Sequence, residues 1–198
     1  AEMRALLKSA VDRSFNRVTV DGEMSTNDTV LFLASGASGV RPGPESLKLI
    51  GAALDAMLLR VALMIVADGE GSTKIMRLRV TGAESQGDVL RVARAIADSP
   101  LVKTAMHGGD PNWGRIISST GAAMAGHSLP AATLDLCGVR VVDKGSACPV
   151  STEDRVLMTS AVKLPEVEIE LDLGVGNEST EIYFADLGHE YITINAEY

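Results

Sequence analysis

The sequence predicts an α/β fold, in the broader α+β sense that one chain mixes helices with strands. Residues 88–99 carry apolar side chains at the spacing of a helix with one buried face. Residues 74–80 alternate apolar and charged side chains, as a half-buried strand does. The chain has 198 residues, of which 46% are hydrophobic and 22% are charged. This is an ordinary globular balance, and the length allows one good core or two small ones.

The first half of the chain predicts alternating helices and strands. We expect helices at residues 1–15, 45–67 and 88–99, and strands at residues 18–20, 30–34 and 74–80. The run 30–34 is apolar throughout and is bounded by turn residues, which is typical of a strand buried on both faces. The helix at 45–67 is apolar around more than half of its circumference, which predicts burial on most sides. We expect no apolar run long enough to cross a membrane.

The second half predicts a strand at 101–106 and then a helix that runs to residue 121. Asp110 is expected as the N-cap of that helix and Pro111 as its first residue. Strands at 133–136 and 139–142 suggest a hairpin around Cys137-Gly138. The last strands are expected as follows: 167–173, 180–185 and 191–194. We place a domain boundary near Pro100, between residues 1–99 and a small α/β unit at residues 100–198.

Charge and cysteine content exclude several classes of partner. The formal net charge is −8, which argues against nucleic acid and anionic membranes, because both need basic patches. Cys137 and Cys148 have no Cys-x-x-Cys spacing and suit a reducing cytosol. The histidines occur singly, so we expect no metal site. The chain begins with Ala1 rather than Met, so we expect it to be part of a longer polypeptide.

The segment 68–74 contains a candidate ligand-binding carboxylate. It reads Asp-Gly-Glu-Gly-Ser-Thr-Lys, which lacks the residue order of a P-loop and the third glycine of a dinucleotide fingerprint. Glu70 lies between two glycines, where the backbone can approach a ligand closely and a carboxylate can bind an ammonium group. An exposed loop glutamate with no ligand explains the same residue, so both interpretations stay open.

Other polar residues have a structural and a functional interpretation. Asn27 and Asp28, between the two first strands, are explained by a turn that bonds nearby backbone or by a ligand. Trp113, the only tryptophan, is expected to anchor the packing of its helix. Arg115 can pair with a carboxylate of protein or substrate. Lys103 is expected at the surface or as a strand-end contact.

Stretches in the same order along nearly the whole chain resemble the β chain of the ornithine acetyltransferase (ArgJ) family. These stretches are residues 14–36, 67–74, 99–115 and 186–198. The third stretch includes Asp-Pro-Asn-Trp-Gly-Arg. The resemblance implies a DmpA/ArgJ-like αββα layered sandwich. Residues 1–99 would then belong to a nucleophile core domain completed by an α chain, and residues 100–198 to the smaller C-terminal α/β unit.

The resemblance also implies an activity. Members of this family cleave themselves before a threonine, which becomes the nucleophile of the β chain. That threonine is expected just upstream of residue 1, so we expect no catalytic residue in this chain. Acetyl would pass from N2-acetylornithine to the threonine and then to glutamate. Glu70 and Asn195 match the family's substrate-binding residues, and Asn27 and Asp28 would shape the site. By itself, Asn195 is interpreted as a strand-end residue.

Partners and alternatives follow from the same resemblance. We expect an α chain from the same precursor in an α2β2 heterotetramer, a cytoplasmic location, no cofactor, no nucleic acid and no membrane. Acetyl-CoA as a second donor is left open. Two other functions are a self-processing aminopeptidase of related fold, against which Asp-Pro-Asn-Trp-Gly-Arg argues, and a non-catalytic binding subunit.

Overall fold

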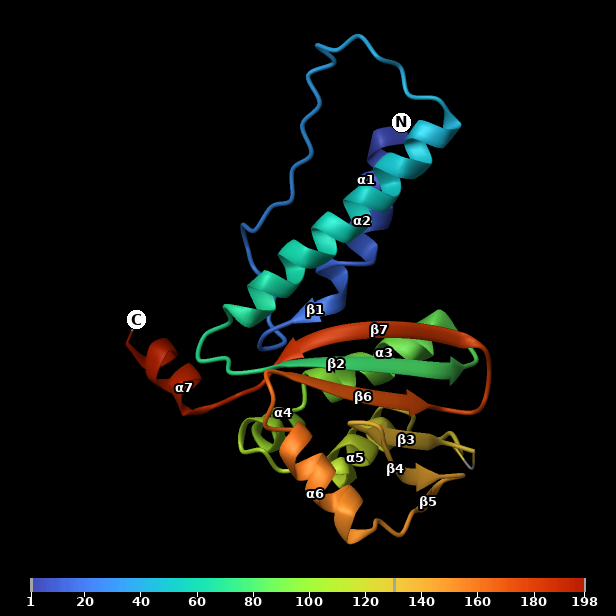
Figure 1. Ribbon diagram of the computed structural model, residues 1–198, viewed down its shortest axis with the longest axis vertical. Coiled ribbons are helices and arrows are strands. Elements are labelled where there is room, and N and C mark those ends of the chain that lie inside the picture. Colours follow the sequence, from blue (N-terminus) through green and yellow to red (C-terminus); the bar gives the residue numbers. More distant parts are fainter. Residues whose placement is uncertain (1, 130, 198) are drawn as a thin grey trace.

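A computed structural model describes residues 2–129 and 131–197. It contains a mixed seven-stranded sheet, with helices packed against one face and the α1–α2 pair next to one edge (Figure 1). The helices are α1 Glu2–Asp12, α2 Pro44–Ala67, α3 Gln86–Ala97, α4 Pro100–His107, α5 Trp113–Ala123, α6 Thr152–Ala161 and α7 His189–Ala196, with a short 3-10 helix at Phe15–Arg17. The strands are β1 Val18–Thr19, β2 Ile75–Ala83, β3 Thr133–Leu136, β4 Val139–Asp143, β5 Ser146–Ala147, β6 Glu166–Asp172 and β7 Glu178–Ala185. The expected first residue of α1 and the last residue of the family-like tail lie outside the described residues.

The sheet has the order β1-β7-β2-β6-β3-β4-β5. β2 is antiparallel to β7 and parallel to β6, and β3 continues the sheet antiparallel to β6. The β3–β4 hairpin turns through Cys137 and Gly138, both with positive φ, as a tight hairpin turn requires. The α/β class is therefore confirmed. The described residues form one sheet, so the second sheet of an αββα sandwich stays a prediction about the whole protein.

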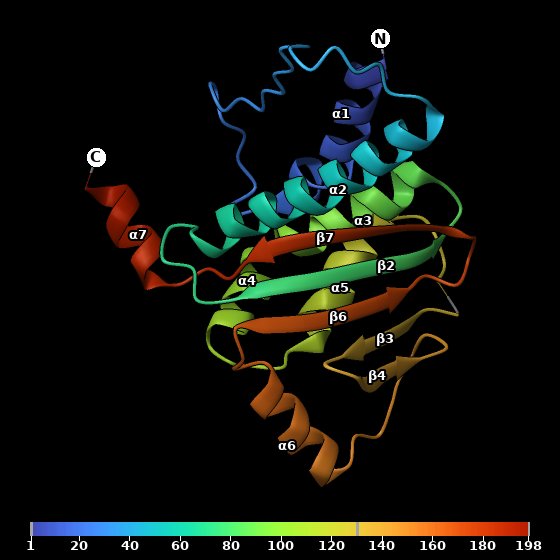
Figure 2. The ribbon, with the colours of Figure 1, turned by 45° about the horizontal axis from the view of Figure 1, so that its top comes forward.

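Alternation along β2 places the core. Met76, Leu78 and Val80 are fully buried, and α3 covers this face of β2 and β7 with α5 beside it (Figure 2). The inward residues of α3 are those expected from its spacing: Val89, Val92, Ala93 and Ile96, all fully buried. Burial of each large apolar side chain stabilises the fold by about 1.5–3 kcal/mol. A second, smaller cluster joins α1 to α2 through Ala10, Leu54 and Leu58.

The opposite face of the sheet carries charged side chains. Arg77 of β2 donates to Glu181 of β7 and lies 3.5 Å from Glu168 of β6. Arg140 of β4 pairs with Asp135 of β3. These pairs are exposed to solvent, so each contributes little to stability. These charged side chains keep the face of the sheet opposite α3 in contact with water.

Three expected strands are not strands, and two of them are the runs 30–34 and 191–194. Residues 30–34 have no regular secondary structure, and Leu31 and Leu33 are 75% and 87% exposed. The edge strand on this side of the sheet is the two-residue β1, and within residues 2–129 and 131–197 the run pairs with no strand. Residues 191–194 belong instead to α7, where Asn195 Nδ2 donates to the carbonyl of Tyr191 one turn earlier. Both predictions were therefore wrong.

Helix starts in the middle of the chain also differ from expectation. Residues 101–106 are helical: Pro100 is the first residue of α4, and Ser99 Oγ accepts from Val102 N as the N-cap. Ser99-Pro100 therefore marks the start of α4 as well as the end of α3. The next helix begins at Trp113 with Asn112 as its N-cap residue, not at Asp110. Helix α6 was not predicted; Ser151 caps it by accepting from Asp154 N.

Helix α2 has the expected bounds but not the expected burial. Leu54, Leu58, Ala62 and Val66 are buried, whereas large apolar residues on its other side are exposed. Contrary to expectation, α2 is long and apolar enough, by length and composition, to cross a membrane. Asp55 in its middle accepts two bonds of 2.7 Å from Arg13, so that part of α2 is tied to its neighbour by an ion pair.

The predicted division at residue 100 lies within a continuous sheet. β2, from the first half, is hydrogen-bonded between β6 and β7, from the second half. The largest core cluster likewise draws on residues before and after Pro100. Assignment of residues 1–99 and 100–198 to separate domains of the complete protein remains a prediction.

Candidate functional site

Three segments meet at one end of the sheet. The loop 68–74 joins α2 to β2, the segment 186–188 joins β7 to α7, and residues 20–22 follow β1. In Figure 1, the end of α2, the start of β2 and the base of α7 lie together at the left of the sheet. Helix α7 has no buried residue and extends away from the body of the molecule.

Glu70 and Asn195 are in direct contact at this end. Asn195 Nδ2 donates to Glu70 Oε2, although the two residues are 125 positions apart in the sequence. Both side chains are exposed, so a ligand in solvent can reach them. The Glu70 carboxylate offers an acceptor for an ammonium group, and Asn195 Oδ1 offers a second acceptor, because the two N–H groups of the amide already donate to Glu70 and to the carbonyl of Tyr191.

The glycines beside Glu70 are explained by close packing. Gly71 has φ +67°, and a Cβ there would lie 2.6 Å from Glu190 Cβ and 2.7 Å from Tyr191 N. A Cβ at Gly69 would lie 2.9 Å from a methyl group of Val20. The loop can therefore touch α7 on one side and the end of β1 on the other only with glycine at these positions.

Asp21 and Tyr191 stand beside the contact and were not among the predicted site residues. Tyr191 Oη donates to Asp21 Oδ2 at 3.0 Å. Partial burial raises the pKa of Tyr191, and the hydrogen bond to Asp21 and the negative charges of Asp21, Glu70 and Glu23 raise it further. The site is therefore acidic, which suits a cationic ligand. The one sequence signal for Tyr191 is its position one helical turn before Asn195.

Lys103 is a buried lysine under the site. It is not at the surface: it lies on α4 and is 2% exposed. It does contact strand ends, because its Nζ donates to the carbonyls of Val20, directly after β1, and Ala185, the last residue of β7. Nζ also lies 5.6 Å from the centroid of the Phe184 ring. Burial lowers the pKa of Lys103 to about 8, against the opposing effect of Asp98, Asp186 and Asp21.

Replacing Lys103 with methionine is expected to remove a pH-dependent part of stability. The folded-state pKa of about 8 lies below the ordinary value of 10.5, so between these pH values the unfolded chain holds a proton that the folded chain has lost. Stability from this group therefore rises as pH goes from 8 to 10.5. Urea unfolding at both pH values should show this gain in the wild type relative to Lys103→Met. Parallel pH profiles for the two proteins would contradict it.

The remaining predicted residues lie elsewhere. Asn27 and Asp28 are in an exposed turn in which their backbone amides donate to Ser25 Oγ. That agrees with the structural interpretation, and a role in shaping the site stays a prediction. Trp113 packs against the core, as expected. Arg115 donates to the carbonyl of Leu101 at 2.7 Å rather than to a carboxylate.

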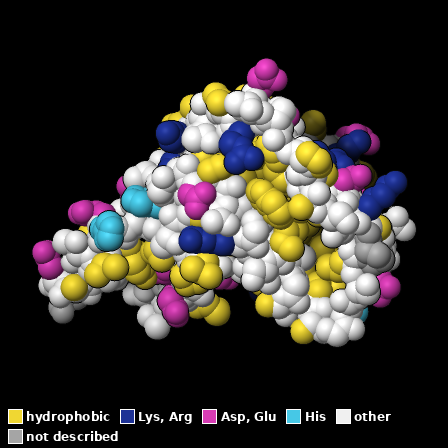
Figure 3. All heavy atoms as spheres, turned by 90° about the horizontal axis from the view of Figure 1, so that it is seen from below, with side chains coloured by type: hydrophobic (Ala, Val, Ile, Leu, Met, Phe, Trp, Pro, Cys, Tyr) yellow, Lys and Arg dark blue, Asp and Glu magenta, His cyan; other side chains and the backbone are white. Residues whose placement is uncertain are grey.

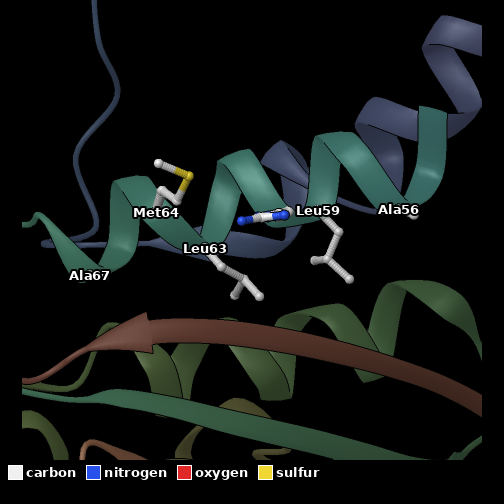
Figure 4. Close-up of a pocket in the computed structure, with 6 residues that line it drawn as sticks. Ala56, Leu59, Leu63, Met64 and Ala67 are labelled. Atoms are coloured by element: carbon white, nitrogen blue, oxygen red, sulfur yellow. The ribbon is translucent and has the colours of Figure 1, made fainter. Parts of the chain in front are cut away.

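Among residues 2–129 and 131–197, no group of histidine, cysteine, aspartate and glutamate side chains is arranged to hold a metal ion. Cavities near α2 lie beside the sheet. One, of about 520 Å³, is lined by α2 residues and is shown in Figure 4, where Leu59 and Leu63 point toward β7. A groove of about 710 Å³ continues between α2 and the residues around Thr180 of β7.

Comparison with known proteins gives consistent matches along the whole chain. Residues 1–198 match the ArgJ family. The arginine biosynthesis bifunctional protein ArgJ of Nitratidesulfovibrio vulgaris is 45% identical over 193 residues, which are 98% of this chain and 49% of that protein. The glutamate N-acetyltransferase of Methanosarcina mazei is 41% identical over 198 residues, which cover 98% of this chain and 50% of that protein. The chain thus spans about half the length of the curated relatives it matches.

A solved structure agrees in fold. The arginine biosynthesis bifunctional protein ArgJ from Bacillus halodurans superposes with a TM-score of 0.90 and 33% sequence identity, covering 100% of this chain and 93% of that chain. The mixed sheet with its helices is therefore shared with a solved ArgJ chain. On the match of every residue to the family and on this shared fold, the chain belongs to the ArgJ family.

Proposed function

We propose that the protein containing this chain is a glutamate N-acetyltransferase of arginine biosynthesis, which moves acetyl from N2-acetylornithine to glutamate. The observation that carries the proposal is the contact between Glu70 and Asn195, residues remote in sequence that form one exposed polar pair. Membership in the ArgJ family supports the reaction class. The acidic surroundings of the pair, with Asp21 and Tyr191 next to it, favour a substrate that carries an ammonium group.

In the proposed reaction, a threonine upstream of residue 1 acts as the nucleophile. Its free α-amine accepts the hydroxyl proton while the oxygen attacks the acetyl carbonyl of N2-acetylornithine. The proton then passes to the departing nitrogen, and ornithine leaves an acetyl ester on the threonine. The amine of glutamate attacks that ester, the threonine oxygen regains a proton, and N-acetylglutamate is released. The residues of this chain contribute binding and orientation. Glu70 holds a substrate ammonium group, and Asn195 orients the Glu70 carboxylate and the ammonium group.

The proposed partner is an α chain made from the other half of the same precursor. Large apolar residues of α2 and of the loop before it are exposed: Met24, Leu31, Leu33, Val40, Leu49, Met57, Met64 and Ile65. Such a concentration of exposed apolar side chains marks an interface. Apolar atoms also lie on the face seen from the end opposite α2, but there they are interspersed with charged groups (Figure 3). We propose that the α chain covers α2, and that two such αβ pairs form an α2β2 heterotetramer in the cytoplasm.

An assay of the complete protein tests the proposal. Purified protein should form N-acetylglutamate and ornithine from N2-acetylornithine and glutamate, and should leave peptides with free amino ends intact. Peptide hydrolysis without acetyl transfer would favour the self-processing aminopeptidase, and neither activity would favour a binding subunit. Acetyl-CoA is included as a second donor, because relatives named as bifunctional proteins and as glutamate N-acetyltransferases both match.

A further inference from the structure

Asp186 is a buried carboxylate for which the proposed chemistry gives no role. It follows the last residue of β7, is 3% exposed, and lies under the loop that carries Glu70. Its Oδ1 accepts from Thr73 N at 2.8 Å and Lys74 N at 2.9 Å, and its Oδ2 accepts from Thr73 Oγ1 at 2.6 Å. One side chain therefore binds both the backbone and a hydroxyl of the Glu70 loop.

Two further donors complete its surroundings. Ser72 Oγ lies 3.3 Å from Oδ1, and His107 Nδ1 lies 2.7 Å from Oδ2. Burial raises the pKa of Asp186, but the hydrogen bonds from Thr73, His107 and Lys74 lower it by more, so the carboxylate is ionised at neutral pH. A carboxylate accepts at both oxygens and donates nothing, which matches a position where every neighbour donates.

The position of Asp186 in the chain links the two halves of the site. By its side chain it holds residues 72–74, just after Glu70. By its backbone it belongs to the short segment that leads into α7, on which Asn195 lies. That segment is itself closely packed, because a Cβ at Gly188 would lie 2.2 Å from the ring of His107. The contact of Glu70 with Asn195 is exposed, whereas this link beneath it is buried.

We propose that Asp186 is the positioning residue of the substrate-binding pair. It fixes the Glu70 loop to the base of α7, so that the Glu70 carboxylate and the Asn195 amide face the same ligand. This inference rests on the proposed function, since it assigns a task to the same site. Helix α7 has no buried residue. Exposed contacts of Tyr191 and Glu190 hold its first turn, and the buried link at its base joins that turn to the Glu70 loop.

Steady-state kinetics of the complete protein test this role with Asp186→Asn, Thr73→Val and Val92→Ala. Asparagine at position 186 keeps one acceptor oxygen but replaces the other with an NH2 group, which cannot accept from the donors around it. Valine at position 73 removes only the Thr73 hydroxyl. We expect Asp186→Asn to raise KM for N2-acetylornithine about tenfold, with a smaller change in kcat, because misplacing a binding group by an ångström is costly. Thr73→Val should also raise KM for N2-acetylornithine, but by a smaller factor than Asp186→Asn.

Val92→Ala is the control for stability alone. Val92 is fully buried on α3, so its truncation should lower the melting temperature without touching the loop. We expect its KM to equal that of the wild type. An unchanged KM in Asp186→Asn, or an equal rise in Val92→Ala, would overturn the inference. If Asp186→Asn does not fold, Thr73→Val, which retains the carboxylate, decides by the same comparison.

Hydrogen exchange separates this inference from the proposed function. In Asp186→Asn, amides of residues 70–75 and of residues 187–196 should both exchange faster, because both segments lose the shared link. Unchanged exchange in the two segments would overturn the inference whatever the substrate is. Absence of acetyl transfer in the wild type would instead remove the proposed function, and the exchange result would still decide whether Asp186 ties the segments together.

Discussion

Replacement of Glu70 by glutamine in the complete protein is expected to raise KM for N2-acetylornithine roughly ten- to hundredfold, since a hydrogen bond to a charged group contributes about 1.5–3 kcal/mol. The change removes the negative charge but keeps the size of the side chain and an oxygen that Asn195 can bond. Because Glu70 is exposed in a loop, folding should be unaffected. Initial rates over a range of substrate concentrations measure the effect.

Glu84→Gln is the matched control for Glu70→Gln. Glu84 is likewise exposed, but it follows the opposite end of β2. It should have the KM of the wild type. Combining Glu70→Gln with Asn195→Ala adds a second test: if the two side chains bind one ligand together, the effects of the single changes will not add in the double variant. Unchanged kinetics in Glu70→Gln would remove this residue from the site.

Charged substitutions on the outer side of α2 are expected to abolish assembly with the α chain. Met64 and Ile65 are 61% and 49% exposed, and in Figure 4 Met64 points away from the sheet. Glutamate at both positions would bury unpaired charges in an apolar interface, a change that costs several kcal/mol per ion. Co-purification of the two chains, followed by measurement of the mass of the assembly in solution, should show loss of the complex.

The control for this experiment is Val156→Glu on α6. Val156 is 62% exposed and its helix lies at the end of the molecule away from α2 (Figure 1). This variant should assemble normally. If the α2 variant retains the complex, the α chain binds elsewhere and the exposed side of α2 needs another occupant. If it loses the complex but the isolated chain stays folded by circular dichroism, the proposed interface is supported.

The parts of the fold that could be predicted are those in which neighbouring residues alone decide the structure. Alternation in β2 and helical spacing in α3 identify the inward side chains correctly, because each element buries one face within this chain. Residues 30–34 and the outer side of α2 have an equally apolar sequence, yet most of their large side chains are exposed, and Phe32 is only partly buried against the α1–α2 cluster. Burial of these two surfaces would depend on atoms outside the described residues. An apolar sequence pattern does not identify what covers such a surface.

Start signals and end signals are easily exchanged in a sequence. Pro100 does end α3, but with Ser99 as N-cap it begins α4 at once, so a strand was expected where a helix occurs. Tyr191 to Ile194 alternates like a strand, but in the part of the chain that the structure describes no strand pairs with it, and α7 forms instead. These errors arise because short segments satisfy both periods, and tertiary contacts then decide between them.

The candidate site was predicted only in part for a related reason. Glu70 is marked locally by its flanking glycines, and Asn195 was assigned by resemblance; the structure places them in contact. Asp186, Asp21 and Lys103 carry no local signal. Each acts across the fold, on loops that lie far from it in the sequence. Such residues are identified only when the packing of the loops is known.

The most direct test of the proposed reaction is the mass of the complete protein after incubation with N2-acetylornithine in the absence of glutamate. The account predicts a gain of one acetyl group per catalytic unit, located by peptide mapping on the amino-terminal threonine of the chain that contains these residues. Addition of glutamate should remove the group and release N-acetylglutamate. Transfer of acetyl to glutamate without any acetylated protein, or an acetyl group on a different residue that glutamate discharges, would contradict it.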